Sequence, residues 1–231
     1  MKYQDIISGR FISRPNRFIA MVELEGEVIK AHVKNTGRCK ELLIPGATVY
    51  LEPSDNPNRK TRFSLIAVDK EGKLVNMDSQ APNKVLEEAL QNGPVHGFPK
   101  IESLRREYTY GSSRLDFLIN EKVLVEVKGV TLEEKGKTYF PDAPTERGVR
   151  HLEELMQGLE QGYEAIVCFI IQMSDVDSFS PNDITHPEFG DTLRKAEKAG
   201  VSILAFQCDV TPGEILLADP VPVKLSPLTN A

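Results

Sequence analysis

Two apolar runs joined by a short polar turn constrain the fold of this chain more than any other feature. The first run ends with residues 115–119 (LDFLI), and the second covers residues 123–128 (VLVEVK). Aliphatic and aromatic runs of this length, separated by the three polar residues 120–122, predict a β-hairpin. If those three residues form the turn, Ile119 pairs with Val123. Counting back along the hairpin then places Asp116 opposite Glu126.

Three charged residues interrupt these apolar runs: Asp116, Glu126 and Lys128. Side chains alternate along a strand, so Glu126 and Lys128 share one face and Asp116 joins them from the neighbouring strand. Two carboxylates and a lysine in this arrangement can hold a divalent cation beside a water and a phosphate. This is the D-x(n)-(D/E)-x-K pattern of restriction-endonuclease-like nucleases. The alternative is a solvated sheet face with an ordinary Glu–Lys pair. Burial favours the metal site, because charges in a central strand are costly unless paired or metal-bound.

Composition sets the class of protein. The 231 residues suffice for one large domain or two modest ones, and 40% hydrophobic and 27% charged residues are typical of a soluble globular protein. The sequence has neither an apolar run of the ~20 residues that a membrane span needs nor an N-terminal signal peptide, so no membrane partner is expected. Its three widely spaced cysteines (Cys39, Cys168, Cys208) fit no disulfide or zinc pattern, which predicts a cytoplasmic location.

Charge differs between the two parts of the chain, although the whole carries −6. Residues 1–80 contain 13 Lys and Arg and 10 Asp and Glu, a net charge of +3, whereas residues 81–231 contain 15 and 24, a net charge of −9. A mildly basic first part and an acidic second part are typical of a binding module joined to a metal-dependent catalytic module.

The first eighty residues predict a small β-barrel. Short strand-like segments occur at residues 6–12, 18–24, 28–33, 48–52, 63–68 and 74–76, with turns between them. We expect an OB-fold-like domain over 1–80, a barrel that commonly binds single-stranded nucleic acid. The candidate nucleic-acid contacts are Arg14, Arg17, Lys34, Arg38, Lys40, Arg59, Lys60 and Arg62. The basic loop 56–62 is the strongest of these, and a solvated turn is its alternative.

Residues 81–231 predict a second domain in which strands and helices alternate. Asn83 is expected to cap a helix over 84–90, and Thr145 a helix over 146–162. A polar connection is expected over 133–142, buried strands over 165–171 and 201–207, and a helix over 187–199 that ends at Gly200. Residues 215–217 are expected to be peripheral. This order predicts an α/β domain with parallel strands on either side of each helix.

Several longer motifs resemble a known family, the sugar fermentation stimulation protein A (SfsA) proteins. They are residues 35–37 (NTG), 45–46 (PG), 110–111 (YG), 114–117 (RLDF), 126–128 (EVK), 139–148 (YFPDAPTERG) with 151–152 (HL), 179–181 (FSP) and 200–205 (GVSILA). The resemblance covers nearly the whole chain. It implies an α+β/α/β two-domain fold, with an N-terminal OB-fold and a C-terminal PD-(D/E)xK domain. It also implies DNA binding, with nuclease activity on DNA or RNA.

The resemblance also implies roles for particular residues. Asp116, Glu126 and Lys128 match the nuclease motif, Glu88 matches an acidic position on the preceding helix, and Arg147 and His151 lie on the helix that follows. Asp116, Glu126, the Val127 carbonyl and Glu88 would then hold Mg²⁺ or Mn²⁺. Leu115 stands where the motif name has proline, which the chemistry does not require. For Glu88 the alternative is a solvated helix face, and for His151 a surface histidine facing Glu154 or solvent.

Two other functions compete with the nuclease. One is a catalytically inactive DNA-binding regulator of sugar (maltose) metabolism genes. The other is a carbohydrate enzyme with paired carboxylates, which the Lys128 beside Glu126 argues against. The sequence leaves the oligomeric state open, with a homodimer as one arrangement.

Overall fold

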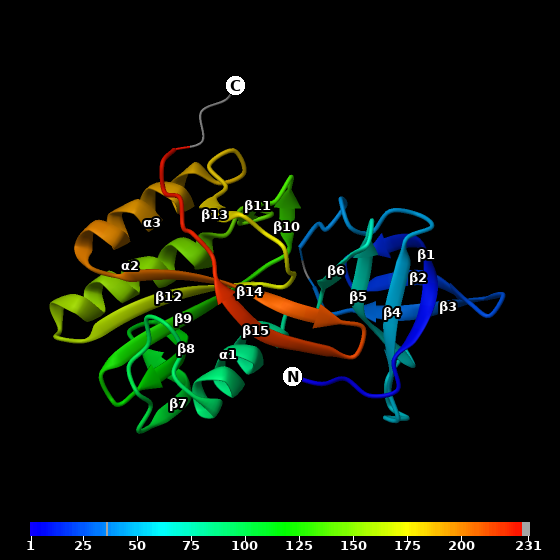
Figure 1. The fold of residues 1–231 in the computed structure, drawn as a ribbon, viewed down its shortest axis with the longest axis horizontal. Helices are drawn as coiled ribbons and strands as arrows, with labels where there is room; N and C mark the ends of the chain where they lie inside the picture. Colours follow the sequence, from blue (N-terminus) through cyan, green and yellow to red (C-terminus); the bar gives the residue numbers. More distant parts are fainter. Residues whose placement is uncertain (36, 228–231) are drawn as a thin grey trace.

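The computed structural model describes residues 1–35 and 37–227, which form a β-barrel followed by an α/β domain (Figure 1). Six strands make up the sheet of the barrel, in the order β3-β2-β1-β4-β5-β6. Parallel pairing of β3 with β5 closes it. These strands are β1 (Ile7–Asn16), β2 (Ile19–Leu24), β3 (Glu27–Val33), β4 (Thr48–Pro53), β5 (Phe63–Lys70) and β6 (Lys73–Asn76). All six lie where the sequence predicts strands, and the predicted OB-fold is confirmed.

The second domain is built on a six-stranded sheet in the order β15-β14-β12-β9-β8-β7. Its strands are β7 (Leu104–Tyr110), β8 (Ser113–Ile119), β9 (Val123–Val130), β12 (Glu164–Ile171), β14 (Ser202–Thr211) and β15 (Glu214–Pro220). The helices are α1 (Ala81–Asn92), α2 (Glu146–Glu160) and α3 (Pro187–Ala199). β9 pairs parallel with β12, and β12 with β14, as the alternation of strands and helices predicts. Among the described residues, no helix combines the length and apolarity needed to cross a bilayer.

The two faces of this sheet are covered by different helices. α2 and α3 pack on one face, and α1 packs on the other (Figure 1). Side chains along β9 point alternately to the two faces of the sheet. Leu124 packs in the core beneath α2, whereas Val125 and Val127 pack in the core beneath α1. The sheet is therefore buried on both sides, as is typical of parallel sheets.

Two predictions about connecting segments are wrong. The expected polar connection over 133–142 contains a hairpin, β10 (Leu132–Glu134) and β11 (Lys137–Phe140), which pairs with β13 (Ser178–Pro181). The segment expected to be peripheral forms β15, an edge strand antiparallel to β14. β10, β11 and β13 are only three or four residues long, and β15 ends in Asp219 and Pro220. Their pairing partners, rather than their own patterns, make them strands.

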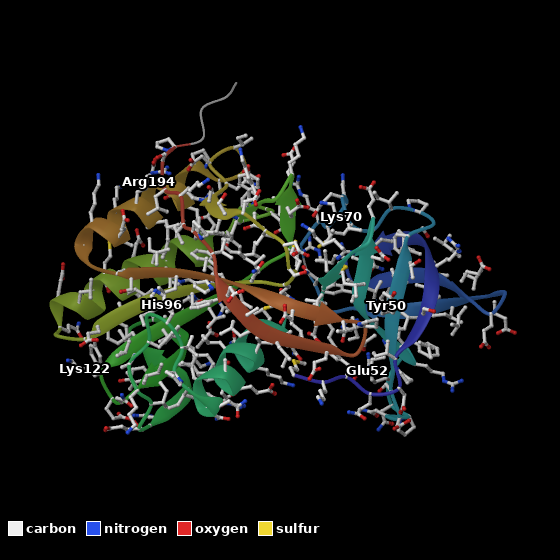
Figure 2. The ribbon with its side chains drawn as sticks, viewed as in Figure 1. Tyr50, Glu52, Lys70, His96, Lys122 and Arg194 are labelled. Carbon is white, nitrogen blue, oxygen red and sulfur yellow. The ribbon has the colours of Figure 1, made fainter. Side chains whose placement is uncertain are left out.

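Polar contacts fix the barrel against the second domain. Lys70, labelled in Figure 2, bonds the Glu133 carboxylate at 2.6 Å across this interface. The Gln172 amide donates to the backbone carbonyls of Asn76 and Asp78 at 3.1 and 3.0 Å. The first residues of the chain also reach across, since the Tyr3 N–H donates to the Gly213 carbonyl at 2.8 Å. These contacts hold the two domains in one arrangement.

Candidate metal centre

Asp116 lies where the β8–β9 hairpin opens. The structure confirms the predicted pairing of Ile119 with Val123, and the backbone ladder ends at the pair Phe117–Val125. Beyond that point, Asp116 Oδ2 accepts a hydrogen bond from the Val127 N–H at 2.7 Å. A side-chain carboxylate therefore continues the ladder where the two backbones separate. This places Asp116 beside Glu126 on β9.

Glu126 is the most buried carboxylate of this group, with 3% of its surface exposed. Its Oε1 accepts a hydrogen bond from Lys128 Nζ at 2.5 Å and also contacts His151 Nδ1. Its Oε2 is buried and has no hydrogen-bond partner among the described residues. A solvated sheet face, the alternative that the pattern left open, is therefore excluded. The unpartnered oxygen is a costly feature unless another group binds it.

The two carboxyl groups have opposite pKa shifts. Burial and the nearby Glu126 charge raise the pKa of Asp116 to about 6. Burial also acts to raise the pKa of Glu126, but Lys128 and His151 outweigh it and hold that pKa below its usual range. Glu126 is therefore the ionised partner, and Asp116 is a carboxyl whose negative charge lacks full compensation. A cation between them would supply that compensation.

His151 and Arg147 come from the first two turns of α2. Thr145 caps this helix as predicted, with its Oγ1 accepting from the Gly148 N–H at 3.1 Å. Arg147 Nε donates to His151 Nε2 at 3.1 Å, so the proton of a neutral His151 lies on Nδ1 and is donated to Glu126. His151 is buried, which excludes the surface position considered from the sequence. Arg147 is exposed, and its bond to Nε2 orients His151.

Glu88 does not join this group. Its side chain is 49% exposed and pairs with the N-terminal ammonium of Met1 at 2.6 Å. The residue of α1 that reaches the centre is Asn83, whose Nδ2 donates to Asp116 Oδ1 at 2.6 Å. The sequence prediction made Asn83 a cap, whereas the helix already begins at Ala81. Pro82 was the available signal, because proline favours the first turn of a helix.

The group suits a hard cation that keeps part of its water shell. Among the described residues, no set of three or more His, Cys, Asp or Glu side chains surrounds a common point. Mg²⁺ commonly binds through one or two carboxylates and retains several waters, so Asp116 and Glu126 suffice for it. The free, buried Oε2 of Glu126 is the direct structural support for this fit.

The basic residues predicted to contact nucleic acid fall into three groups. Arg14 donates to the backbone carbonyls of residues 17, 35, 37 and 38, so it holds a loop in place and its predicted contact role is wrong. Arg17, Arg38, Lys40 and Arg62 are exposed around the barrel. The remaining three line one cavity next to the second domain: Lys34, Arg59 and Lys60. The structure thus brings together three of the eight.

Comparisons with known proteins agree with this architecture. Residues 12–77 match the family model "SfsA N-terminal OB domain", and residues 80–214 match "Sugar fermentation stimulation protein RE domain". Sugar fermentation stimulation protein homologues from Desulfitobacterium hafniense and Ruminiclostridium cellulolyticum are 55% and 53% identical over 97% of this chain and 99% and 100% of theirs. The solved structure of Pyrococcus furiosus SfsA in complex with Ca²⁺ matches with a TM-score of 0.86 and 31% identity, over 97% of this chain and 98% of that one.

Proposed function

The chain belongs to the sugar fermentation stimulation protein (SfsA) family, and we propose that it binds nucleic acid and hydrolyses phosphodiester bonds with the help of a divalent metal ion. The observation that carries this proposal is the buried Glu126, with one oxygen held by Lys128 and the other without a partner among the described residues, beside the half-buried Asp116. The Pyrococcus furiosus relative was solved with Ca²⁺, which supports a divalent ion in this chain too.

Asp116, Glu126 and the Val127 carbonyl would hold the ion, with Mg²⁺ or Mn²⁺ as the working metal. When bound, the metal lowers the pKa of water and neutralises charge on the phosphate. Glu88 is left out of this set, because it is paired with the N-terminus. DNA is the expected substrate and RNA the alternative.

The side chains of this chain supply the rest of the chemistry. Lys128 Nζ lies 2.5 Å from Glu126 Oε1, so its positive charge would lie beside a phosphate bound at this centre and would stabilise the charge that builds up in the transition state. His151 holds Glu126 from the α2 side, and Asn83 holds Asp116 from the α1 side. Positioned carboxylates of this kind lose less freedom when the metal binds.

Cleavage assays test the proposal directly. Purified protein is incubated with Mg²⁺ or Mn²⁺ and labelled single-stranded and duplex DNA and RNA. Asp116→Ala and Lys128→Ala are expected to lose at least ~100-fold in rate. The matched control is Lys122→Ala, because Lys122 lies on the turn of the same hairpin and its side chain is exposed. Equal cleavage by wild type, Asp116→Ala and Lys128→Ala contradicts the catalytic assignment.

A DNA-binding regulator with an inactive nuclease fold is the second candidate. It is favoured by the small number of protein ligands, since no group of three or more His, Cys, Asp or Glu side chains occurs there in the part of the chain that the structure describes. Thermal unfolding with and without Mn²⁺, together with DNA binding in chelator, separates the two. The nuclease predicts a rise in melting temperature with Mn²⁺. Full DNA binding in chelator with no Mn²⁺-dependent shift identifies the regulator.

A further inference from the structure

Two cavities meet where the barrel joins the second domain. One, of about 420 Å³, is lined by Arg59 and Lys60 of the barrel and by Gln80. The other, of about 320 Å³, is lined by Gln80, Asn83, Lys84 and Asp116. Gln80 borders both, so the cavities are neighbours, and together they mark a path from the barrel loop to the candidate metal centre. We call this path, defined by Arg59, Lys60, Gln80, Asn83, Lys84 and Asp116, the interdomain groove.

On the basis of the proposed function, we propose that one single strand of nucleic acid lies along the interdomain groove. The barrel loop then grips the strand next to the bond that the second domain cuts. The two domains act on the same strand.

The uncompensated charges along the groove have the sign that a phosphate backbone requires. Lys60 and Lys84 are exposed and form no ion pair with any residue that the structure describes. Arg59 donates one hydrogen bond to Ser64 Oγ at 3.0 Å and keeps its charge. These three cations are therefore available to phosphates.

The acidic residues that face the groove are already neutralised, apart from Asp116 at the metal centre. Glu87 is paired with Arg106, and Glu107 Oε2 lies 3.1 Å from Arg114 Nε. Helix α1 adds to the positive field, since its N-terminus lies at Gln80 with no side-chain cap and no acidic residue in the first turn. A phosphate in the groove is therefore repelled mainly near Asp116, where the metal ion is proposed to bind.

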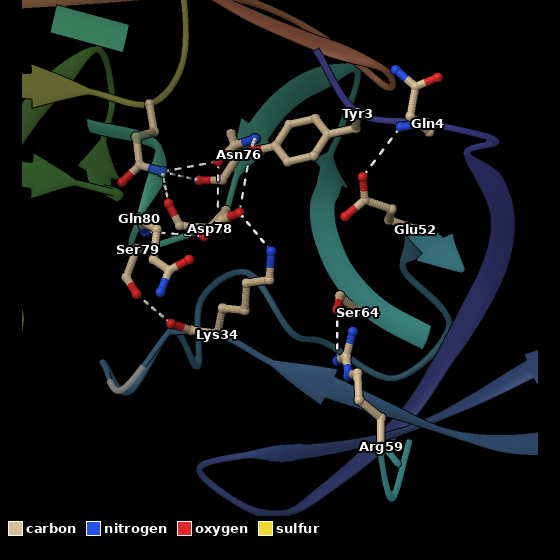
Figure 3. Close-up of polar contacts among 11 residues, drawn as sticks. Tyr3, Gln4, Lys34, Glu52, Arg59, Ser64, Asn76, Asp78, Ser79 and Gln80 are labelled. Carbon is tan, nitrogen blue, oxygen red and sulfur yellow. Dashed lines mark hydrogen bonds and ion pairs between the residues drawn. The ribbon is translucent and has the colours of Figure 1, made fainter. Parts of the chain in front are cut away.

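The junction between the two cavities is held firmly. Asp78 accepts from Lys34 Nζ at 2.9 Å and from the Gln80 N–H at 3.0 Å, and the Ser79 hydroxyl bonds the Lys34 carbonyl (Figure 3). This links the last turn before α1 to the end of β3. Asp78 is thus held by Lys34 of the barrel and by Gln172 of the second domain, so the position of Gln80 between the barrel loop and Asp116 is set before a substrate arrives.

Single-stranded substrate follows from the shape of this path. The groove runs from a barrel loop onto the N-terminus of α1 and into the sheet of another domain. Bending a duplex sharply across a domain junction costs deformation energy, a cost that a flexible single strand does not carry. A single strand can follow this path, and OB-folds commonly track one with basic residues. The groove offers charges rather than exposed aromatic faces, since its Phe117 is buried, so little base preference is expected.

Binding measured without cleavage tests the groove. Fluorescence anisotropy in Ca²⁺ compares a 20-nucleotide single strand with its duplex, and gel analysis checks that the probe stays intact. Lys60→Glu and Lys84→Glu are each expected to weaken binding of the single strand ~3- to 10-fold. Each is also expected to lower the slope of log K against log salt by ~0.7. The matched control is Lys195→Glu, an exposed lysine on α3 outside the groove, which is expected to stay within ~2-fold of wild type.

Two results overturn the inference. One is an equal loss of binding in Lys195→Glu and the two groove variants. The other is duplex binding as tight as that of the single strand. Hydrolysis of bis(p-nitrophenyl) phosphate by the wild type with Mn²⁺ is measured separately, because this small diester needs only the metal centre. If it is not hydrolysed, the proposed function fails while the binding measurements still decide whether the groove holds a strand.

Discussion

Replacing Asp116 by asparagine should make the metal-free protein more stable at neutral pH. The carboxylate accepts two hydrogen bonds, from the Val127 N–H at 2.7 Å and from Asn83 Nδ2 at 2.6 Å. Asparagine has the same shape and can still accept from the Val127 N–H through its Oδ1. Its Nδ2 then donates to Asn83, once the Asn83 amide has turned over. The substitution therefore removes the charge and keeps both contacts.

The expected gain follows from the raised pKa of Asp116. The pKa is about 6 in the folded state, where burial and Glu126 disfavour the charge, and ~3.9 in the unfolded chain. Between these values the folded state binds more protons than the unfolded state. The raised pKa of Asp116 therefore contributes fully to the stability of the folded state below pH ~4, and this contribution is lost as the pH rises through ~6. Above that, the wild type loses up to ~3 kcal/mol that Asp116→Asn keeps.

Urea denaturation in EDTA from pH 4 to pH 8 measures this difference. The free energies of unfolding of the two proteins should be equal near pH 4 and differ by ~1–3 kcal/mol at pH 8. Each kcal/mol corresponds to a difference in melting temperature of ~2–4 °C. Asp191→Asn is the control, because Asp191 is exposed and its hydrogen bond from Arg194 lowers its pKa. Adding Mn²⁺ should make the wild type more stable than Asp116→Asn, because binding of the ion stabilises the wild type. Wild type as stable as Asp116→Asn at pH 8 in EDTA would refute the reasoning.

Two further predictions concern the surroundings of the metal centre. His151→Ala removes the donor to Glu126 and should lower the cleavage rate or the metal affinity ~10- to 100-fold. His151→Asn keeps a donor near the Nδ1 position and should recover most of the lost rate or affinity. Titration with Mn²⁺ and single-turnover rates check this, and equal losses in both variants would argue against a positioning role. Glu88→Gln should leave cleavage within ~2-fold of wild type, because Glu88 pairs with Met1. A large loss of cleavage rate in Glu88→Gln would instead indicate that Glu88 belongs to the candidate metal centre.

Local patterns in the sequence determined the parts of the protein that depend on neighbouring residues. Alternation along residues 123–128 fixed that Glu126 and Lys128 share a face, and the three-residue turn fixed the pairing of Ile119 with Val123. Thr145 and Gly200 marked a helix start and a helix end correctly, because capping is a property of one turn of chain. The barrel strands followed from their turns in the same way.

Only the tertiary structure decided which distant residues meet at the centre. His151 reaches Glu126 across 25 positions, and Asn83 reaches Asp116 across 33. Glu88 is one residue beyond Glu87, yet it faces the N-terminus, because each step along a helix turns the side chain by about 100°. Arg14 looked like a nucleic-acid contact and instead binds four backbone carbonyls. The sequence specifies which groups each element carries. Their meeting depends on how helices and strands pack, which no local pattern records.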